Sequence, residues 1–338
     1  MLNFSPVEAT ESHPLSSPSL GECLEDWLER CSRRGLKVST WRGYRTMASL
    51  YIPDELRQLP VDRVTTAHLD ELYDKLLQEG RRNGHGLAPV TVRKVQIILR
   101  STFARALKRG WITANPALQA ESPPARACKP PMFPVWSPQE LQRFLSCTQG
   151  HPYYAAFHLA ATTGLRRGEL LGLRWCDVDL ENALLQVLQT VIVVNAEVLI
   201  ETPKSASSRR GVDLDARTVE VLRQHNRTMT NAHVRGGSPD LVHGSALVFS
   251  RAGGEPLHPA LFSYWFQRQV ELAGLRRIRL HDLRHTHATL ALQAGVHPKV
   301  VCERLGHSSI TVTLDTYSHV LPTMQRDAAE QVAALIKA

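Results

Sequence analysis

The stretch His281-Asp-Leu-Arg-His285 places three basic or titratable side chains close together in the sequence. His281, Arg284 and His285 are spaced at i, i+3 and i+4, so on an α-helix they share one face. Good helix formers continue up to Gly295, which marks a C-terminal stop. The arginine offers a planar fork for anion oxygens, and the imidazoles titrate near neutral pH. The stretch therefore favours a site that holds an anion and serves it with protons.

The same stretch allows two other interpretations. His281, His285 and His287 could recruit zinc, because imidazole is a common zinc ligand. They could also be ordinary solvated side chains. The anion site is favoured by two further stretches of the chain, since a short motif alone matches by chance. These stretches are Thr163-Gly-Leu-Arg166-Arg-Gly-Glu169-Leu and Leu305-Gly-His307-Ser-Ser, the second followed by Asp315-Thr-Tyr317-Ser-His.

Taken in order, these stretches resemble the tyrosine recombinase (phage integrase) family. The family pattern is an arginine in a G-L-R-x-x-E turn, a lysine in a β-turn, H-x-L-R-H, an L-G-H segment and a nucleophilic tyrosine. The resemblance runs from about residue 20 to about residue 325, and the ordered set is far more specific than any single motif. The catalytic residues that it implies are Arg166, Lys204, His281, Arg284, His307 and Tyr317.

The resemblance implies transesterification at a DNA phosphodiester. Tyr317 would attack phosphorus, form a 3′-phosphotyrosine and release a 5′-hydroxyl. Arg166 and Arg284 would hold the non-bridging oxygens, and His307 would hydrogen-bond one of them. His281 would act as base or proton relay. These groups replace a metal, so we expect no metal, ATP or other cofactor.

Other polar residues of the same motifs receive different expectations. Glu169 and His285 should orient their neighbours and are not assigned to the catalytic set. His287, His319 and Arg167 are expected to be ordinary structural or surface residues.

Length and composition fit a two-domain protein with an acidic partner. The chain has 338 residues and a formal net charge of +8, which favours nucleic acid. The six cysteines form no C-x-x-C pair, so we expect reduced thiols rather than a disulfide framework. Neither a membrane span nor a signal peptide is apparent. We expect a cytoplasmic protein without a membrane partner, associated with the bacterial nucleoid when it is bound to DNA.

The sequence patterns predict a mainly α-helical chain with a small antiparallel β-sheet. Residues 1–19 have the composition of a disordered tail and leave no room for an arm-binding domain. Residues 20–118 resemble the family's helical, SAM-like core-binding domain, and residues 119–135 form a Pro-rich basic linker. Residues 136–325 resemble its α+β catalytic domain, a DNA breaking-rejoining fold. Residues 326–338 are expected to form a C-terminal helix; the resemblance favours docking on a neighbouring protomer, and packing on its own domain is the alternative.

The region 20–118 shows four amphipathic patterns with expected helix starts. The second helix is expected to be capped by Ser39 or Thr40 and the third by Thr65 or Thr66. A long fourth helix should begin near Ala88. The candidates for DNA contacts, which could equally be solvated surface charges, are Arg42, Arg45, Arg93, Lys94 and Arg100.

The catalytic region opens with Ser137-Pro-Gln-Glu140, a capping box with Pro at the first helical position. Strand-like runs at 184–194, 198–202 and 209–214 predict one three-stranded antiparallel sheet. Lys204 lies in the second turn of this sheet, where the family carries the lysine that protonates the departing 5′-oxygen.

The resemblance implies a site-specific recombinase or integrase that integrates or excises a mobile element. Its partners would be double-stranded recombination sites, three further copies of itself in a homotetramer on synapsed DNA, and an accessory directionality factor. Two alternatives stay open: a type IB topoisomerase-like enzyme, and a DNA-binding factor that has lost catalysis. A zinc hydrolase built on the histidines is a distant third.

Overall fold

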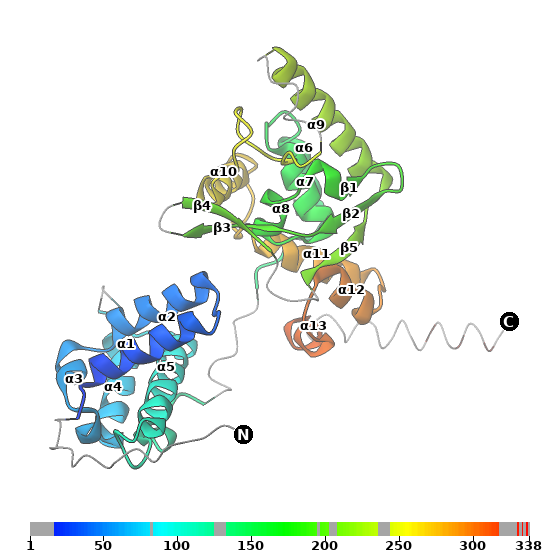
Figure 1. The fold of residues 1–338 in the computed structure, drawn as a ribbon. Coiled ribbons are helices and arrows are strands. Elements are labelled where there is room, and N and C mark those ends of the chain that lie inside the picture. The colour runs from blue at the N-terminus through cyan, green and yellow to red at the C-terminus, as the bar shows by residue number, and fades with distance from the viewer. Residues whose placement is uncertain are drawn as a thin grey trace, which may run out of the picture. The chain divides into compact units, whose positions relative to one another are not determined.

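In this computed structural model the described residues are 17–81, 84–124, 133–194, 197–202, 208–235, 244–317, 330, 333 and 336. They belong to two compact units, residues 1–131 and residues 132–338, called here the first and the second unit. Helices dominate, and the strands form small antiparallel sheets (Figure 1). The predicted fold class is therefore confirmed.

Amphipathic helices around one core make up the first unit. Ser19 caps the first helix by accepting a hydrogen bond from the backbone N–H of Glu22, and the Glu22 carboxylate accepts from the backbone N–H of Ser19 in return. The long α5 buries Val95, Ile98 and Leu99 against the other helices. The helices are α1 (Leu20–Arg33), α2 (Val38–Tyr51), α3 (Asp54–Gln58), α4 (Thr66–Glu79) and α5 (Pro89–Lys108), with 3-10 turns at Val61–Arg63 and Pro116–Leu118.

The start of α2 differs from the sequence prediction. The helix begins at Val38, so Ser39 and Thr40 lie inside its first turn rather than capping it. The carbonyl of Lys37 already accepts from the backbone N–H of Thr40 and of residue 41, which closes the turn two residues early. The predicted cap of α4 is confirmed at Thr65, and α5 begins at Pro89 beside the expected Ala88.

In the second unit helices pack on the small sheets (Figure 1). The predicted capping box is confirmed, because the Ser137 hydroxyl accepts from the backbone of Glu140 and the Glu140 carboxylate accepts from the backbone of Ser137. The helices are α6 (Pro138–Cys147), α7 (Tyr154–Thr163), α8 (Arg167–Leu171), α9 (Ala216–Arg235), α10 (Pro259–Leu272), α11 (Asp282–Gln293), α12 (Pro298–Leu305) and α13 (Ile310–Tyr317), with a 3-10 turn at Trp175–Asp177.

The prediction of a single three-stranded sheet is wrong. The strands are β1 (Val178–Asp179), β2 (Leu184–Val187), β3 (Thr190–Val194), β4 (Glu197–Glu201) and β5 (Arg210–Asp213). They form one sheet in the order β1-β2-β5 and a separate hairpin of β3 with β4, all antiparallel. The run 184–194 is interrupted between β2 and β3, where the Gln189 side chain donates to the carbonyl of Gly172 at 2.7 Å. Thr190 and Val191 then lie so close to Gly168 that no Cβ would fit there, so β3 packs on α8.

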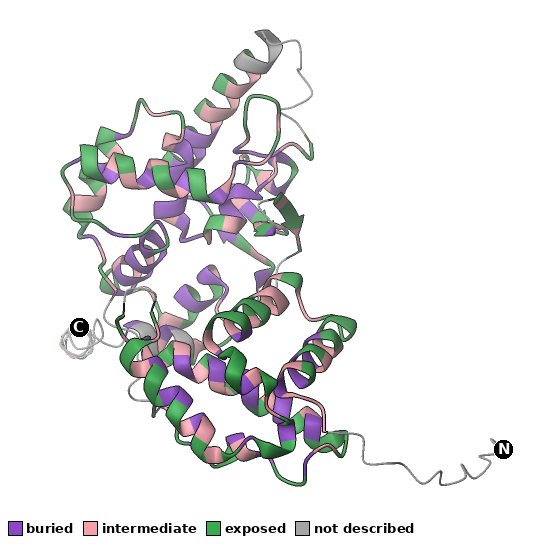
Figure 2. Ribbon diagram, turned by 90° about the vertical axis from the view of Figure 1, so that its left-hand side faces the viewer, coloured by how far each residue is buried: buried purple, intermediate pink, exposed green. Residues whose placement is uncertain are grey.

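Within each unit the residues coloured as buried lie mainly on the inward faces of the helices, and exposed residues lie mainly on the outward faces (Figure 2). The core of the second unit contains a cluster of aromatic rings in tilted, edge-on and stacked contact, at Trp136, Phe144, Phe157, Phe262 and Phe266. Helix α7 is buried along almost its whole length and so forms the centre of this unit. In the part of the chain that the structure describes, no helix is long and apolar enough to cross a membrane.

Several sequence predictions fall outside the described residues. They concern the tail up to residue 16, the linker over residues 125–132, the turn that contains Lys204, and nearly all of the C-terminal helix over residues 326–338.

Candidate active site

The His281 stretch opens α11 with the expected spacing. His281 has helical backbone angles (φ −65°, ψ −25°) although the helix is counted from Asp282, so the three side chains keep their i, i+3, i+4 relation. Asp282 is fully buried and anchors this end of the helix. Its carboxylate accepts from the backbone N–H of Arg279 at 2.7 Å and from the Arg279 guanidinium at 2.7 Å.

Arg284 connects all three motif stretches. Its side chain is 3% exposed, and its Nη1 and Nη2 donate to the carbonyls of Gly164 and Leu305 at 2.9 and 2.7 Å. Burial lowers the pKa of Arg284 to about 9, and the nearby positive charge of Arg166 acts in the same direction. The negative charge of Glu169 acts in the opposite direction but does not offset these two effects, so an incoming anion would further stabilise the charged guanidinium.

Arg166 lies directly after a turn that only glycine can make. Gly164 has φ +66°, and a Cβ on it would come within 2.7 Å of the Leu305 side chain. This close approach brings the two motifs together. Nη2 of Arg166 then donates to the carbonyl of Gly306 at 2.9 Å, and Nη1 donates to Glu169 at 2.6 Å. The described contacts leave the guanidiniums of both Arg166 and Arg284 with further N–H groups that can donate to a ligand.

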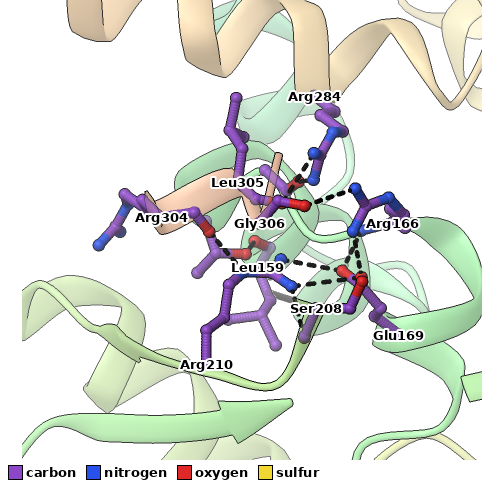
Figure 3. A network of polar contacts seen from close by, with 11 residues as sticks. Leu159, Arg166, Glu169, Ser208, Arg210, Arg284, Arg304, Leu305 and Gly306 are labelled. Atoms are coloured by element: carbon purple, nitrogen blue, oxygen red, sulfur yellow. Dashed lines mark hydrogen bonds and ion pairs between the residues drawn. The ribbon is translucent and has the colours of Figure 1, made fainter. Parts of the chain in front are cut away.

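Glu169 links Arg166 to a second arginine in a buried polar network (Figure 3). The carboxylate of Glu169 is 4% exposed and also accepts from both terminal nitrogens of Arg210, at 2.9 and 3.3 Å. Burial would raise the pKa of Glu169, but Arg210 first and Arg166 second lower it below its usual value. Glu169 is thus held as a carboxylate that fixes Arg166, in agreement with the orienting role expected from the sequence.

His307 follows α12 after a left-handed Gly306 (φ +67°). Its Nδ1 lies 2.8 Å from the hydroxyl of Thr313 on α13. Burial lowers the pKa of His307 to about 4, and the charges of Arg284 and Arg166 contribute. The imidazole is therefore neutral at pH 7 and can serve as a hydrogen-bond partner without adding charge.

Tyr317, at the end of α13, is 1% exposed. Its hydroxyl lies 2.8 Å from Nδ1 of His285, whose ring stacks on Phe133 with centroids 4.0 Å apart and planes at 5°. The His281 ring meets His285 edge-on at 5.1 Å. The imidazole in contact with the phenol is thus His285, and His281 lies behind it.

The protonation states of this contact follow from burial. Burial raises the pKa of Tyr317 to about 12, although Arg284 acts in the opposite direction. Burial, followed by the charge of His281, lowers the pKa of His285 to about 4. At pH 7 the phenol and the imidazole are therefore both neutral, and in the tautomer whose Nδ1 carries no proton the imidazole accepts from the phenol. The pKa of His281 is also lowered, by burial first and by Arg284 second.

The histidines do not form a zinc site among the described residues. No group of three or more His, Cys, Asp or Glu side chains there is placed to hold a metal ion. Nδ1 of His287 lies 3.2 Å from the carbonyl of Ala161, and its Nε2 accepts from Arg304 at 3.3 Å. His287 is therefore a structural residue, as the sequence suggested.

The candidate DNA-contacting residues lie on two helices of the first unit. Arg42 and Arg45 belong to α2, where Arg45 lies over the Trp41 ring at 5.4 Å. Arg93, Lys94 and Arg100 belong to α5. All are at least partly exposed, and their role in DNA contacts stays a prediction.

Sequence reasoning missed Arg210. The signal was present, because side chains alternate along a strand and Arg210 is two residues before Val212. Val212 is buried in the core, so Arg210 on the same face of β5 also points inward. An arginine at an inward position of a strand indicates a buried partner.

Comparison with protein families places the site in a known context. Residues 135–324 match the phage integrase family. The chain belongs to this family. It is a tyrosine recombinase, that is, a DNA strand-transferring enzyme. The matched region contains every candidate catalytic residue from Arg166 to Tyr317.

Individual relatives extend the match over nearly the whole recombinase. It is 27% identical over 329 residues to a tyrosine recombinase XerC-like protein of Caldanaerobacter subterraneus subsp. tengcongensis, covering 92% of this chain and 82% of that protein. It is 24% identical over 335 residues to the ICEBs1 integrase of Bacillus subtilis, covering 98% of this chain and 87% of that one.

Solved structures confirm the fold of the recombinase. The Tn1549 transposon integrase in complex with a circular intermediate DNA has a TM-score of 0.74 at 23% identity, covering 94% of this chain and 100% of that chain. A lambda integrase tetramer bound to a Holliday junction has a TM-score of 0.66 at 18% identity, covering 89% of this chain and 78% of that chain.

Proposed function

We propose that this recombinase cleaves and rejoins DNA at specific sites through a 3′-phosphotyrosine on Tyr317, to integrate or excise a mobile element. One observation carries the proposal: Arg284 bonds the carbonyls of Gly164 and Leu305, so three distant motifs meet at one buried polar cluster. Two guanidiniums, neutral imidazoles and a phenol in one place suit phosphoryl transfer without a metal.

In the proposed cleavage step, Oη of Tyr317 attacks phosphorus and the bond from phosphorus to the 5′-oxygen breaks. Arg166 and Arg284 hold the non-bridging oxygens, on which negative charge grows in the transition state. The neutral imidazole of His307 hydrogen-bonds one of these oxygens. The ester to Tyr317 retains the bond energy, so the reverse attack by a 5′-hydroxyl rejoins the strand without ATP.

The protons move between side chains of the site. The phenolic proton of Tyr317 passes to Nδ1 of His285, with which it is already hydrogen-bonded. The sequence assigned the role of base or relay to His281 and only an orienting role to His285; here His285 is proposed as the base, and His281, in edge contact with it, as the relay. Lys204 gives a proton to the departing 5′-oxygen. The position of Lys204 lies outside the described residues, so its role rests on the order of the motifs.

Tyr317 cannot attack from where it lies. Its hydroxyl is buried with the ring and bonded to His285, and its pKa of about 12 keeps it protonated. We propose that binding of DNA shifts α13 and brings the hydroxyl towards a phosphate held by Arg166 and Arg284. The positive charge of Arg284, which already lowers the pKa of Tyr317, would then help to form the phenolate.

The remaining assignments follow from the family and from the relatives. Residues 20–118 are proposed to bind the core of the recombination site, residues 119–135 to link this domain to the catalytic domain at 136–325, and residues 326–338 to dock on a neighbouring protomer. A homotetramer on synapsed DNA is supported by the lambda integrase tetramer on a Holliday junction. A mobile-element role is supported by the transposon and ICEBs1 integrases. An accessory directionality factor would control the direction of the reaction.

Covalent trapping tests the proposed function. The purified protein would be mixed without metal with a nicked duplex built from the DNA that flanks its gene. A protein–DNA band that resists SDS is expected with the wild type and not with Tyr317→Phe, while both bind the duplex in gel shifts. Sequence-selective binding without any covalent band would favour a DNA-binding factor. An unchanged band with Tyr317→Phe would mean that another nucleophile acts.

A further inference from the structure

The C-terminal end of α12 is held by three arginines at once (Figure 3). The last carbonyl groups of a helix lack partners within the helix and must be satisfied from elsewhere. Here the carbonyls of residues 304–306 each accept from a different guanidinium, at 2.7, 2.7 and 2.9 Å. The donors, in that order, are Arg210, Arg284 and Arg166.

Arg210 differs from the other two donors. Its Nε, Nη1 and Nη2 make four bonds to the protein, while the described contacts of Arg284 use only two, so Arg210 has fewer N–H groups left for a phosphate. Its Nε donates to the carbonyl of Arg304, and its Nη1 donates to the carbonyl of Ser208 at 3.1 Å. Both of its terminal nitrogens also bond the carboxylate of Glu169.

The contacts of Arg210 lead to two proposed phosphate ligands. Through Glu169 they reach Arg166, whose backbone N–H and Nη1 both bond that carboxylate at 2.9 and 2.6 Å. The bond from Arg210 to the carbonyl of Arg304 holds the end of α12, three residues before His307. A single buried guanidinium therefore fixes the first motif and the third relative to β5.

Stability alone is a poor explanation of this arrangement. Removing two charges from water costs about as much as their attraction returns, so a buried ion pair is weak support for a stability role. The fork of a guanidinium does give direction, because it bonds a carboxylate with two parallel N–H groups. Small displacements of groups that hold a reacting phosphate reduce the rate strongly.

We infer that Arg210 is a positioning residue of the recombinase: it sets the Arg166 guanidinium through Glu169 and the His307 segment through the Arg304 carbonyl. The inference rests on the proposed function of Arg166 and His307 in holding phosphate. Lysine at position 210 would keep the charge but lose the fork, so it should not replace arginine.

The test compares Arg210→Ala and Arg210→Lys with Arg174→Ala as the matched control. Arg174 also makes a two-pronged ion pair, with Asp177 at 2.7 and 2.8 Å, but none of its described partners belongs to the candidate site. Single-turnover cleavage of the nicked duplex, duplex affinity and melting temperature would be measured for each variant. Both Arg210 variants should cleave about 100-fold more slowly with unchanged affinity. Arg174→Ala should melt earlier than wild type and cleave at the wild-type rate.

Wild-type cleavage by Arg210→Ala would overturn the inference. Full activity of Arg210→Lys would also overturn it, since charge alone would then suffice. If Arg174→Ala slows cleavage by the same factor, the loss comes from reduced stability and not from lost positioning, and the inference fails.

A second readout does not depend on cleavage. In protein labelled with ¹⁵N-arginine, the Nε–Hε resonance of Arg166 should shift and broaden in Arg210→Ala, while that of Arg174 should not. An unmoved Arg166 resonance would overturn the inference. If the wild type forms no covalent adduct, the proposed function fails, and this resonance still decides whether Arg210 positions Arg166.

Discussion

Replacing Glu169 with glutamine should strongly destabilise the second unit. The carboxylate is 4% exposed and lies 2.6 Å from Nη1 of Arg166 and 2.9 Å from Nη2 of Arg210. Glutamine has the same shape but no charge, and it would turn an amide N–H₂ towards one of the guanidiniums. Arg210 would keep its bonds to the carbonyls of Arg304 and Ser208 but lose its buried counter-charge, which costs about 3–5 kcal/mol.

Scanning calorimetry would measure this cost. For a domain of about 150–250 residues, each kcal/mol corresponds to about 2–4 °C, so the transition should fall by about 6–20 °C. Glu181→Gln is the control, because Glu181 pairs with Arg223 at 3.0 Å but is 87% exposed. This control should leave the transition nearly unchanged, since exposed ion pairs contribute little. Equal melting of Glu169→Gln and wild type would refute the reasoning.

The effect of Glu169→Gln should also depend on pH. Burial raises the pKa of Glu169, but Arg210 and Arg166 more than offset this, so the folded chain favours the carboxylate. The stability that the ionised carboxylate gives to the folded state is complete above the pKa of an unfolded glutamate, about 4.3. It is lost as the pH falls through the pKa of Glu169 in the folded state. The difference in stability between wild type and variant should therefore be full at pH 7 and narrow below about pH 4. A difference that widens on acidification would contradict this sign.

Three further changes test other parts of the site. Lys204→Ala should cleave slowly and recover on a duplex with sulfur in the 5′-bridging position; a lack of recovery would remove Lys204 from the acid role. Phe133→Ala should raise the pKa of His285 from about 4 towards about 6.5, because burial causes the low value; an unmoved NMR titration would show that the Phe133 ring does not shield it. Tyr317→Phe keeps the buried ring and loses only its bond to His285, so urea unfolding should show a loss of about 1 kcal/mol; a loss above about 3 kcal/mol would mean a wider rearrangement.

Features set by neighbouring residues were predictable from the sequence. The cap at Ser137, the turn at Gly164 and the end of α12 at Gly306 each depend on local hydrogen bonds or on a positive φ. The meeting of Arg166, Arg284 and His307 was implied only by the resemblance to the family, because no local pattern sets contacts across about 140 residues.

Contacts made through tertiary packing were not predictable. The division of the strands into two sheets depends on the approach of β3 to Gly168 of α8, which lies more than 20 residues earlier in the sequence. The start of α2 was missed because the carbonyl of Lys37 closes the first turn before the expected capping residues. The contact of Tyr317 with His285, and the stacking of Phe133 on that ring, require the folded arrangement of three distant segments.

Mapping the covalent adduct is the most direct test of the proposed chemistry. The trapped complex would be digested with nuclease and protease, and the remaining peptide would be sequenced by mass spectrometry. We expect a nucleotide attached through its 3′-phosphate to the hydroxyl of Tyr317, and a free 5′-hydroxyl on the released strand. A nucleotide on any other side chain, or a 5′-phosphate linked to the protein, would contradict the assignment of Tyr317 and the direction of attack.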